Sequence, residues 1–447
     1  MARMSGTDGV RGVANGPVLN AELAYKLGRA AALYFGREVK TPKILIGRDT
    51  RLSGTMLEAA LAAGICSAGG NAHLLGVIPT PAVSYLTEAL QANAGIVISA
   101  SHNPFEDNGI KFFARTGYKL PDAVEDEIEA LVKQPIDYTK TRIGSNLGRV
   151  IRETDMGALY VQHIVDSADA KLNGLTVVMD CANGANSDIA PSILRHLGAR
   201  VIPIFHEPNG ININNGCGST HLEALQKKVV EVGADCGIAN DGDADRCLAV
   251  DENGQVLDGD QIMLICALEL MRQGKLKDNM LVTTVMSNVG LHKAMREHGG
   301  HTVKTAVGDR YVLEEMLRND YKLGGEQSGH IIFGDLVRTG DGMMTAVKLL
   351  GTLVRHNRTL SQLGALMVKY PQVLLNVRVK DKNGWEENSA ICDVIQTYTK
   401  KLGEDGQVLV RASGTEPLIR IMAQGPNQAE LDTICEAIAE VVRKEMA

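Results

Sequence analysis

Short apolar runs, each followed by a small-residue turn and a helix-length segment, recur three times along the chain. The first run of each set begins at Lys43 (KILIG), Leu175 (LTVVMD) or Met280 (MLVTTV). A second run follows 28, 24 or 21 residues later, at Asn71, Ala199 or His301, and a third begins at Ala94, Ala234 or Tyr321. Strands at this spacing with helices between them are βαβ units, which form parallel sheets covered on both faces. The pattern therefore predicts three α/β domains of similar plan.

The last part of the chain has a different pattern. Three strand candidates, VLLNVRV, QVLVRAS and LIRIMAQ, precede one amphipathic helix predicted over Gln428 to Met446, which is an α+β arrangement. Polar stretches with Pro and Gly suggest boundaries at Gln134 to Thr154, at Asp251 to Asp258 and near Tyr370. The predicted fold class is therefore α/β, with three similar α/β domains of mixed, mainly parallel sheets at 1–152, 153–252 and 253–368, and a smaller C-terminal α+β domain at 369–447.

Composition and charge exclude several classes of protein. Hydrophobic residues make up 45% of the 447 and aromatics only 4%, so we expect a globular core of Ala, Val, Ile and Leu. A formal charge of −7 argues against a nucleic-acid partner. The most apolar stretch, Gln261 to Met271, is interrupted by Glu269 and is shorter than the roughly 20 residues that span a bilayer. With no leader pattern at the N-terminus and eight cysteines without a C-x-x-C pair, we expect a cytoplasmic protein with reduced thiols and no membrane partner.

Ligands bind open parallel sheets beyond the carboxyl ends of the strands, and an unusual motif follows the third strand candidate of each α/β unit. In the second unit this motif is DGDADR, where Asp241, Asp243 and Asp245 would repel one another unless a cation neutralises them. An EF-hand is excluded because its sixth position is Arg246 instead of Gly. A solvated acidic turn is the alternative. Mg²⁺ fits better, because it takes few carboxylates and adds phosphate oxygens, which implies a phosphorylated partner.

In the first unit the motif is SASHNP, which places Ser99, Ser101 and His102 in a turn after a buried strand. A serine there could be a nucleophile, although neither the G-x-S-x-G nor the S-x-x-K pattern of hydrolases is present. A turn that only caps the strand is the alternative. Lys111 begins the next predicted strand and could supply a positive charge near the serine.

Three further motifs carry groups suited to sugars and phosphates. GGEQSGH, in the third unit, offers a carboxylate, an amide, a hydroxyl and an imidazole to sugar hydroxyls, or it is only a turn shaped by glycines. RASGTEPLIR, with Arg411 and Arg420 near its ends, can clamp a dianion or form an ordinary hairpin. SGTDGVRG lets Arg11 reach a phosphate, but it lacks the G-K-[ST] ending of a P-loop.

Together these motifs resemble those of the α-D-phosphohexomutase superfamily. TDGVRG, SASHNP, DGDADR, GEQSGH and RASGTEP occur in that family's order and span the whole chain. The resemblance implies four domains around a central cleft. It makes Ser101 the serine that carries a phosphoryl group, and it makes Asp241, Asp243 and Asp245 the ligands of one Mg²⁺ ion, together with a phosphate oxygen on Ser101.

The resemblance also implies roles for the other motif residues. Glu326 and Ser328 would hold the hydroxyls of a phosphosugar substrate. The phosphate that is not transferred would be gripped by Arg411, Ser413, Gly414, Thr415 and Arg420. The reacting phosphoryl group would be surrounded by Arg11, His102, Lys111 and Arg246, with His330 as a candidate proton carrier.

The Gln in GEQSGH is similar to the residue found at this position of the motif in the glucosamine branch of the superfamily. The implied reaction interconverts glucosamine 6-phosphate and glucosamine 1-phosphate through a phosphoserine enzyme. Its intermediate, glucosamine 1,6-bisphosphate, or a similar hexose bisphosphate would also act as activator, and the product would lead towards UDP-N-acetylglucosamine and the bacterial cell wall. The alternatives are a phosphomannomutase or phosphoglucomutase specificity, a metal-dependent phosphatase, and a non-catalytic phosphosugar sensor. The resemblance leaves open whether the chain forms a homodimer.

Overall fold

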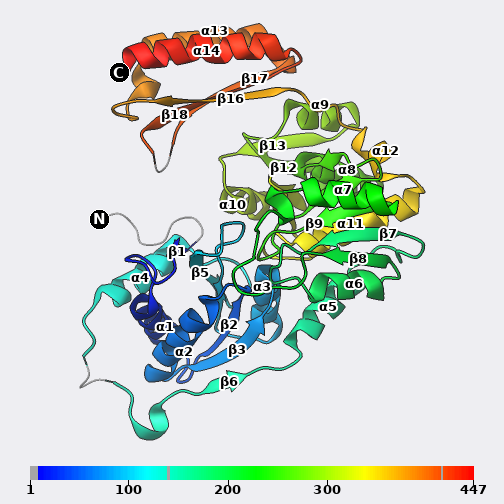
Figure 1. Ribbon diagram of the computed structural model, residues 1–447. Coiled ribbons are helices and arrows are strands. Elements are labelled where there is room, and N and C mark those ends of the chain that lie inside the picture. Colours follow the sequence, from blue (N-terminus) through cyan, green and yellow to red (C-terminus); the bar gives the residue numbers. More distant parts are fainter. Residues whose placement is uncertain (1–8, 138–140, 414–415, 447) are drawn as a thin grey trace.

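The computed structural model describes residues 9–137, 141–413 and 416–446, and these residues form four sheets (Figure 1). In the first three sheets the predicted third strands are β4 (Ala94–Ile98), β9 (Cys236–Ala239) and β14 (Leu323–Gly325). Each is followed by an antiparallel partner, β5 (Asp107–Ala114), β10 (Leu248–Asp251) or β15 (Ile331–Phe333). The motifs after the third strands are therefore hairpin connections, and the sheet holds both of their ends.

The first sheet has six strands, in the order β1-β5-β4-β2-β3-β6. Its remaining strands are β1 (Val10–Val13), β2 (Lys43–Arg48), β3 (Asn71–Val77) and β6 (Val150–Arg152). The helices of this domain are α1 (Ala21–Phe35), α2 (Gly54–Ser67), α3 (Thr80–Ala89) and α4 (Asp122–Lys133). The core of α1, α2 and α4 lies on one face of the sheet, and α3 packs on the other. Every residue of β4 is buried, which explains why its sequence is apolar without alternation.

The second sheet has the order β11-β10-β9-β7-β8, with β9, β7 and β8 parallel. Its other strands are β7 (Thr176–Asp180), β8 (Arg200–Ile204) and β11 (Val256–Leu257), and its helices are α5 (Met156–Asp166), α6 (Ile189–His196) and α7 (Glu223–Val232). The predicted boundary after residue 252 is wrong by a few residues, because β11 still pairs with β10. The chain leaves this sheet only at Asp258, which caps the next helix.

The third sheet has the order β13-β12-β14-β15, with β12 (Met280–Thr284) parallel to both β13 (His301–Thr305) and β14. Its helices are α8 (Gly259–Arg272), α9 (Val289–Glu297), α10 (Asp309–Asn319), α11 (Gly342–His356) and α12 (Leu360–Gly364). The side chains of Asp258 and Gln261 form a capping box that starts α8.

The fourth sheet is antiparallel, in the order β16-β18-β17, as expected for an α+β unit. It contains β16 (Gln372–Arg378), β17 (Gln407–Ala412), β18 (Leu418–Gln424), α13 (Ser389–Leu402) and α14 (Gln428–Glu445). The expectation of one helix is wrong, because α13 lies beside α14 (Figure 1). Apolar side chains do recur on α13 with helical spacing, at Ile391, Ile395, Tyr398 and Leu402.

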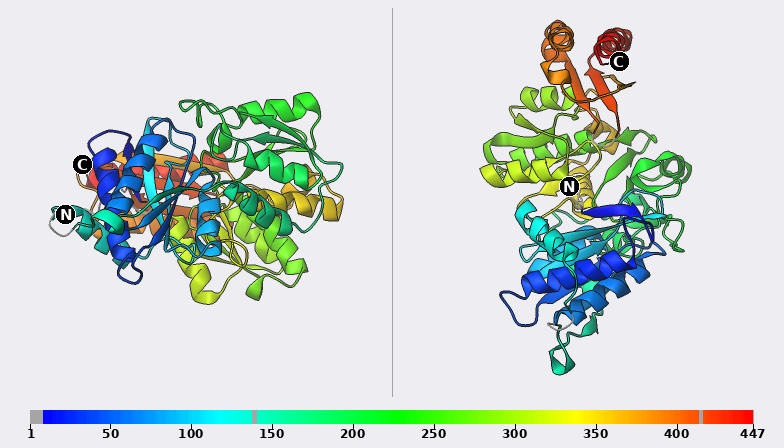
Figure 2. Two further views of the ribbon diagram at one scale, coloured as in Figure 1. Left: turned by 90° about the horizontal axis from the view of Figure 1, so that it is seen from below. Right: turned by 90° about the vertical axis from the view of Figure 1, so that its left-hand side faces the viewer.

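The apolar clusters in the described residues divide the molecule unequally. One apolar cluster runs through the first three domains, from Val97 and Phe113 through Tyr160 to Leu264. The fourth domain has its own core between its sheet and α14, and Figures 1 and 2 show it set apart at one end of the molecule. Among the helices that the structure describes, none has both the length and the apolar character needed to cross a membrane.

Glycines let α1 and α2 pack closely, and this gives a test of the apolar cluster that these two helices share. A Cβ on Gly64 would lie 2.0 Å from the carbonyl oxygen of Tyr25. We expect Gly64→Ala to lower the free energy of unfolding by about 1 to 3 kcal/mol, because the helices must move apart. Urea unfolding followed by circular dichroism measures the change. Gly157→Ala on α5 is the control, because its Cβ would meet its nearest neighbour, Ile189, at 3.5 Å. Equal midpoints for the two variants would contradict this packing explanation.

Candidate active site

Ser101 lies at the carboxyl end of β4 with 3% of its surface exposed. Its backbone adopts a positive φ of 53°, which non-glycine residues rarely do. The backbone N–H of Ser101 donates to Ser99 Oγ at 3.0 Å, and Ser99 Oγ in turn donates to Asp49 Oδ2 at 2.6 Å. The SASHNP turn is thus anchored to a buried carboxylate on the segment that follows β2.

The DGDADR motif faces this serine. The Ser101 hydroxyl donates to Asp241 Oδ2 at 2.5 Å, although 140 residues separate the two in sequence. Asp241, Asp243 and Asp245 are all buried, and one carboxylate oxygen from each lies within 4.8 Å of the others. The structure therefore brings the predicted nucleophile and all three predicted metal ligands together.

First-domain side chains compensate part of this negative charge. Lys111 Nζ lies 3.0 Å from Asp243 Oδ2 and 3.9 Å from Asp245 Oδ2. The Thr80 hydroxyl also donates to Asp243 Oδ2, at 2.8 Å. Lys111 stands in the middle of β5, opposite Val97, and not at the start of a strand as expected. Its position is fixed by the sheet because it lies within a paired strand.

Burial and mutual repulsion dominate the electrostatics of the three aspartates. Burial and the charges of Asp245 and Asp243 raise the pKa of Asp241 well above its ordinary value. Burial and Asp243 likewise raise the pKa of Asp245. Burial also acts to raise the pKa of Asp243, but Lys111 and the Thr80 hydrogen bond outweigh it and hold this pKa below its ordinary range. The charged forms of Asp241 and Asp245 are thus disfavoured in this buried site, whereas that of Asp243 is stabilised.

The triad passes a structural test for a hard cation. Asp243 Oδ1 and Asp245 Oδ1 are buried, and neither has a hydrogen-bond partner among the described residues. Buried carboxylate oxygens ordinarily find hydrogen-bond donors. Oxygen atoms left over in a compact acidic cluster are the ligands that Mg²⁺ or Ca²⁺ takes. The acidic triad can therefore bind a metal.

Three cationic side chains act on His102, which follows Ser101 in the chain. Arg11 lies on β1 opposite Gly109 of β5, and Arg246 is the last residue of the aspartate motif. Burial, followed by the positive charges of Arg246 and Arg11, lowers the pKa of His102 to about 4. The His102 imidazole is therefore neutral at pH 7, and the permanent positive charge comes from the arginines and Lys111.

The GGEQSGH loop is joined directly to the aspartate loop. Arg246 and His330 form an antiparallel bridge, and the backbone N–H of Cys247 donates to the carbonyl of Gly329 at 3.0 Å. Glu326 Oε1 accepts the backbone N–H of Gly308 at 3.0 Å. Ser328 Oγ and both ring nitrogens of His330 are buried without a hydrogen-bond partner among the described residues. Unsatisfied polar atoms of this kind are available to a polar ligand.

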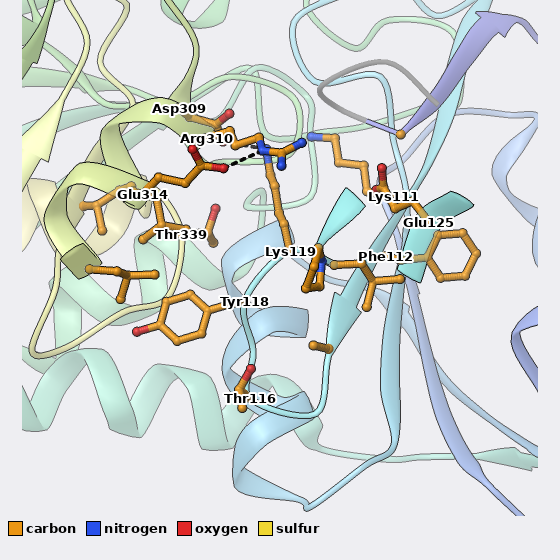
Figure 3. Close-up of a pocket in the computed structure, with 17 residues that line it drawn as sticks. Lys111, Phe112, Thr116, Tyr118, Lys119, Glu125, Asp309, Arg310, Glu314 and Thr339 are labelled. Carbon is orange, nitrogen blue, oxygen red and sulfur yellow. Dashed lines mark hydrogen bonds and ion pairs between the residues drawn. The ribbon is translucent and has the colours of Figure 1, made fainter. Parts of the chain in front are cut away.

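A cavity of about 370 Å³ lies between the first and third domains (Figure 3). Lys111 lines one part of it and Asp309, at the start of α10, lines another. Asp309 Oδ2 lies 2.5 Å from Lys119 Nζ and 3.5 Å from His330 Nε2. The cavity therefore borders two residues that reach the site, since Lys111 contacts Asp243 of the aspartate loop and Asp309 lies near His330 of the GGEQSGH loop. The residues that line it do not include any member of the serine, aspartate or GGEQSGH loops themselves.

The RASGTEPLIR motif is a hairpin of the fourth domain. Arg411 on β17 lies opposite Arg420 on β18, and Ser413 is buried, with its hydroxyl 3.5 Å from an Arg420 guanidinium nitrogen. Burial and the charge of Arg420 lower the pKa of Arg411. Two guanidinium groups on facing positions suit an anion. Two further predicted members, Gly414 and Thr415, lie outside the described residues.

Several residues around the serine were missed by sequence reasoning. They are Asp49, Arg51, Thr80 and Asn214, and each contacts the serine loop or an aspartate. A signal existed for the first two, because the charged segment RDTR follows β2 at the same edge of the sheet as the SASHNP turn. Thr80 and Asn214 carried no comparable signal, because their partners lie in other domains.

Comparison with known proteins identifies the family. The models of phosphoglucomutase/phosphomannomutase alpha/beta/alpha domains I, II and III match residues 2–139, 158–254 and 258–370, and the model of its C-terminal domain matches 374–441. The chain belongs to the phosphoglucomutase/phosphomannomutase family. The four matches follow one another along the chain in the order of the four sheets.

Individual proteins are similar to this chain over most of its length. The phosphoglucosamine mutase of Symbiobacterium thermophilum is 56% identical over 448 residues, covering 100% of both chains, and that of Clostridium novyi is 52% identical, covering 99% of each. A family protein of Burkholderia thailandensis has a TM-score of 0.82 at 25% identity, with 99% of this chain and 98% of that one covered. The N-acetylphosphoglucosamine mutase of Aspergillus fumigatus, solved with GlcNAc-6P and magnesium, shares the fold with a TM-score of 0.66 at 18% identity, covering 82% of this chain and 93% of that one.

We expect Mg²⁺ to raise the melting temperature, because an ion that binds only the folded triad stabilises the folded state. At a hundredfold excess over its Kd the gain is about 2.7 kcal/mol. Thermal unfolding scans with and without Mg²⁺ measure the shift. Asp245→Asn keeps the shape of the side chain but loses a ligand charge, so most of the shift should disappear. Asp166→Asn, on the exposed end of α5, is the control and should keep it. An undiminished shift in Asp245→Asn would mean that the ion binds elsewhere.

Proposed function

We propose that the chain interconverts glucosamine 6-phosphate and glucosamine 1-phosphate through a phosphoserine at Ser101. The observation that carries the proposal is the 2.5 Å hydrogen bond between Ser101 Oγ and Asp241, which puts a nucleophile beside an acidic triad. The relatives named phosphoglucosamine mutase, which are 50% to 56% identical over nearly the whole chain, support the sugar assignment. The cytoplasm is the proposed location.

The reaction is two phosphoryl transfers in opposite directions. In the first, O1 of glucosamine 6-phosphate forms a bond to phosphorus as the bond to Ser101 Oγ breaks, which gives glucosamine 1,6-bisphosphate. The O1 proton passes to a neighbouring base, for which His330 is the candidate. Ser101 Oγ takes up a proton as it leaves phosphorus in this first transfer. After the bisphosphate turns around, Ser101 Oγ gives that proton to a base and attacks the phosphorus at position 6, and the sugar oxygen O6 leaves with a proton. The enzyme ends phosphorylated, as it began, so a small amount of a hexose bisphosphate suffices to activate it.

Charge stabilisation is the main task of the protein in such a transfer. Asp241, Asp243 and Asp245, together with a phosphate oxygen on Ser101, would hold one Mg²⁺ ion. When bound, the ion supplies positive charge to the equatorial oxygens of the moving phosphoryl group. Arg11, Lys111, His102 and Arg246 lie around the same group, and the arginines and Lys111 add permanent positive charge.

Substrate binding divides between two loops of different domains. Glu326 and Ser328 would bind the sugar hydroxyls, and the unpartnered Ser328 hydroxyl supports this role. The phosphate that is not transferred would be gripped by Arg411, Ser413, Gly414, Thr415 and Arg420. This clamp meets the phosphate at position 6 in one half-reaction and at position 1 in the other, so it must recognise charge and shape more than sugar identity.

A phosphomannomutase or phosphoglucomutase specificity would use the same machinery, and a comparison of kcat/KM for the three hexose 6-phosphates distinguishes them. A metal-dependent phosphatase would instead release inorganic phosphate. A phosphosugar sensor is disfavoured because binding alone needs no nucleophile beside the acidic triad and Lys111. Whether the chain forms a homodimer does not affect these assignments.

Ser101→Ala should abolish turnover of glucosamine 6-phosphate in the presence of Mg²⁺ and catalytic sugar bisphosphate. We expect kcat to fall about a thousandfold or more, as for other enzymes that lose their nucleophile. Mass analysis of the wild-type peptide that contains Ser101 should also find phosphate. Ser192→Ala is the control, because the Ser192 hydroxyl lies 3.4 Å from His196 Nδ1 on the same helix, α6, and not at the site. Near-normal turnover in Ser101→Ala would contradict phosphoryl transfer through Ser101.

Arg420→Ala should weaken phosphosugar binding by about 1.5 to 3 kcal/mol, because a charge-assisted hydrogen bond to phosphate is lost. Steady-state kinetics should show KM raised by roughly tenfold to a hundredfold. Arg378→Ala is the matched control, because Arg378 is an exposed arginine on β16 of the same small sheet. If both kcat and KM stay at wild-type values in Arg420→Ala, Arg420 does not belong to the clamp.

A further inference from the structure

The backbone of Ser101 is held from two sides. Its carbonyl oxygen accepts one hydrogen bond from an Arg51 guanidinium nitrogen at 2.9 Å and another from Asn214 Nδ2 at 2.8 Å. The same two donors also reach the carbonyl oxygen of Asn103, at 2.9 and 3.0 Å. A residue with a positive φ persists only where its surroundings hold it there, and these four hydrogen bonds do so for Ser101.

The two donors come from different domains. Arg51 follows β2 in the first domain, is 1% exposed, and is paired with Asp49 through its Nε at 2.8 Å. Asn214 stands between β8 and α7 in the second domain, is 7% exposed, and is anchored by its own N–H, which donates to the carbonyl of Ala182 at 2.9 Å. Arg51 therefore ties the serine loop to its own domain, and Asn214 ties it to the domain that carries the aspartates.

The aspartate loop packs against the same carbonyl. A Cβ added to Gly242, between two of the aspartates, would lie 2.7 Å from the Ser101 carbonyl oxygen and 2.8 Å from Asn214 Nδ2. The absent side chain at Gly242 lets the two loops approach this closely. Asn214 thus lies at the point where the serine loop and the aspartate loop meet.

We propose that Asn214, acting with Arg51, is a positioning residue that sets the place of Ser101 Oγ relative to the aspartate triad. The inference rests on the proposed function, since it matters only if Ser101 exchanges a phosphoryl group. Asn214 bonds the backbone and not the hydroxyl, so it acts through Ser101 and does not touch the reacting atoms. A displacement of about 1 Å in such a group can cost a hundredfold in rate.

If Asn214 only held the first and second domains together, its loss would weaken the docking of these domains. Other hydrogen bonds join the same two domains nearby, from the Thr50 hydroxyl to the Asn183 carbonyl at 2.6 Å and from the Leu52 N–H to the Gly210 carbonyl at 2.8 Å. These remain when the Asn214 amide is removed. In a variant without the Asn214 amide the two domains should therefore stay docked. Only the rate of the chemical step should decrease.

The test variant is Asn214→Gly, because Asn214 has a φ of +59° that glycine adopts without strain. Asn212→Gly is the matched control, since the Asn212 side chain bonds only Glu207 and Asn209 of its own loop in the described residues. We expect kcat of Asn214→Gly to fall tenfold to a hundredfold, with KM within about twofold of wild type. The melting temperature should match that of Asn212→Gly, and Mg²⁺ binding measured by calorimetry should be unchanged.

A kcat of Asn214→Gly within twofold of that of the control would overturn the proposal. The proposal would also be overturned if the loss of kcat came with a weaker affinity for Mg²⁺ or with an equally large rise in KM. If Asn214→Gly unfolds at the assay temperature, Asn214→Asp decides, because aspartate also tolerates the positive φ but cannot donate to either carbonyl. Ser101→Ala in the same assay separates the two hypotheses. Turnover in Ser101→Ala would defeat the proposed function, whereas an inactive Ser101→Ala beside a fully active Asn214→Gly would defeat the positioning role alone.

Discussion

Three buried carboxylates within 4.8 Å of one another are the constraint on which the rest of this structure depends. Concentrating negative charge away from water is costly unless nearby groups compensate it. Here the compensation comes from another domain, because Lys111 on β5 and Thr80 at the start of α3 both reach Asp243. The contacts that dock the first domain on the second are therefore also the contacts that compensate the charge of the aspartates.

The hairpin plan of the sheets gives this arrangement its rigidity. Each loop that carries chemistry joins two strands that pair with one another, so neither end of the loop is free to move. The aspartate loop is further fixed to the GGEQSGH loop at Gly329. A Cβ at this position would lie only 2.4 Å from the carbonyl oxygen of Cys247, so a glycine allows the two backbones to approach this closely. The first three domains, which share one apolar cluster, thus present a preorganised set of groups.

The fourth domain is attached in another way. The Gln424 side chain on β18 accepts the N–H of Val289 at 2.9 Å, and the Asn288 amide bonds both the N–H and the carbonyl of Tyr370, at 3.0 and 2.9 Å. Each such bond contributes only about 1 kcal/mol net. The fourth domain is thus attached to the third by directional bonds and keeps a core of its own, so the proposed phosphate clamp and the proposed nucleophile stand on units with separate cores.

The sequence by itself determined the repeat of strands and helices and the chemical nature of each loop. Apolar runs such as AGIVI specify a strand buried on both faces, and the motifs that follow the third strands contain the serine, the aspartates and Glu326 regardless of how the domains pack. Local pattern was insufficient for α13, and it placed the second boundary inside the β10–β11 hairpin. Only the tertiary structure decided that Ser101 meets Asp241 across 140 residues and that Arg51 and Asn214 share one carbonyl. Such contacts arise between surfaces of different domains, and no local spacing in the chain encodes them.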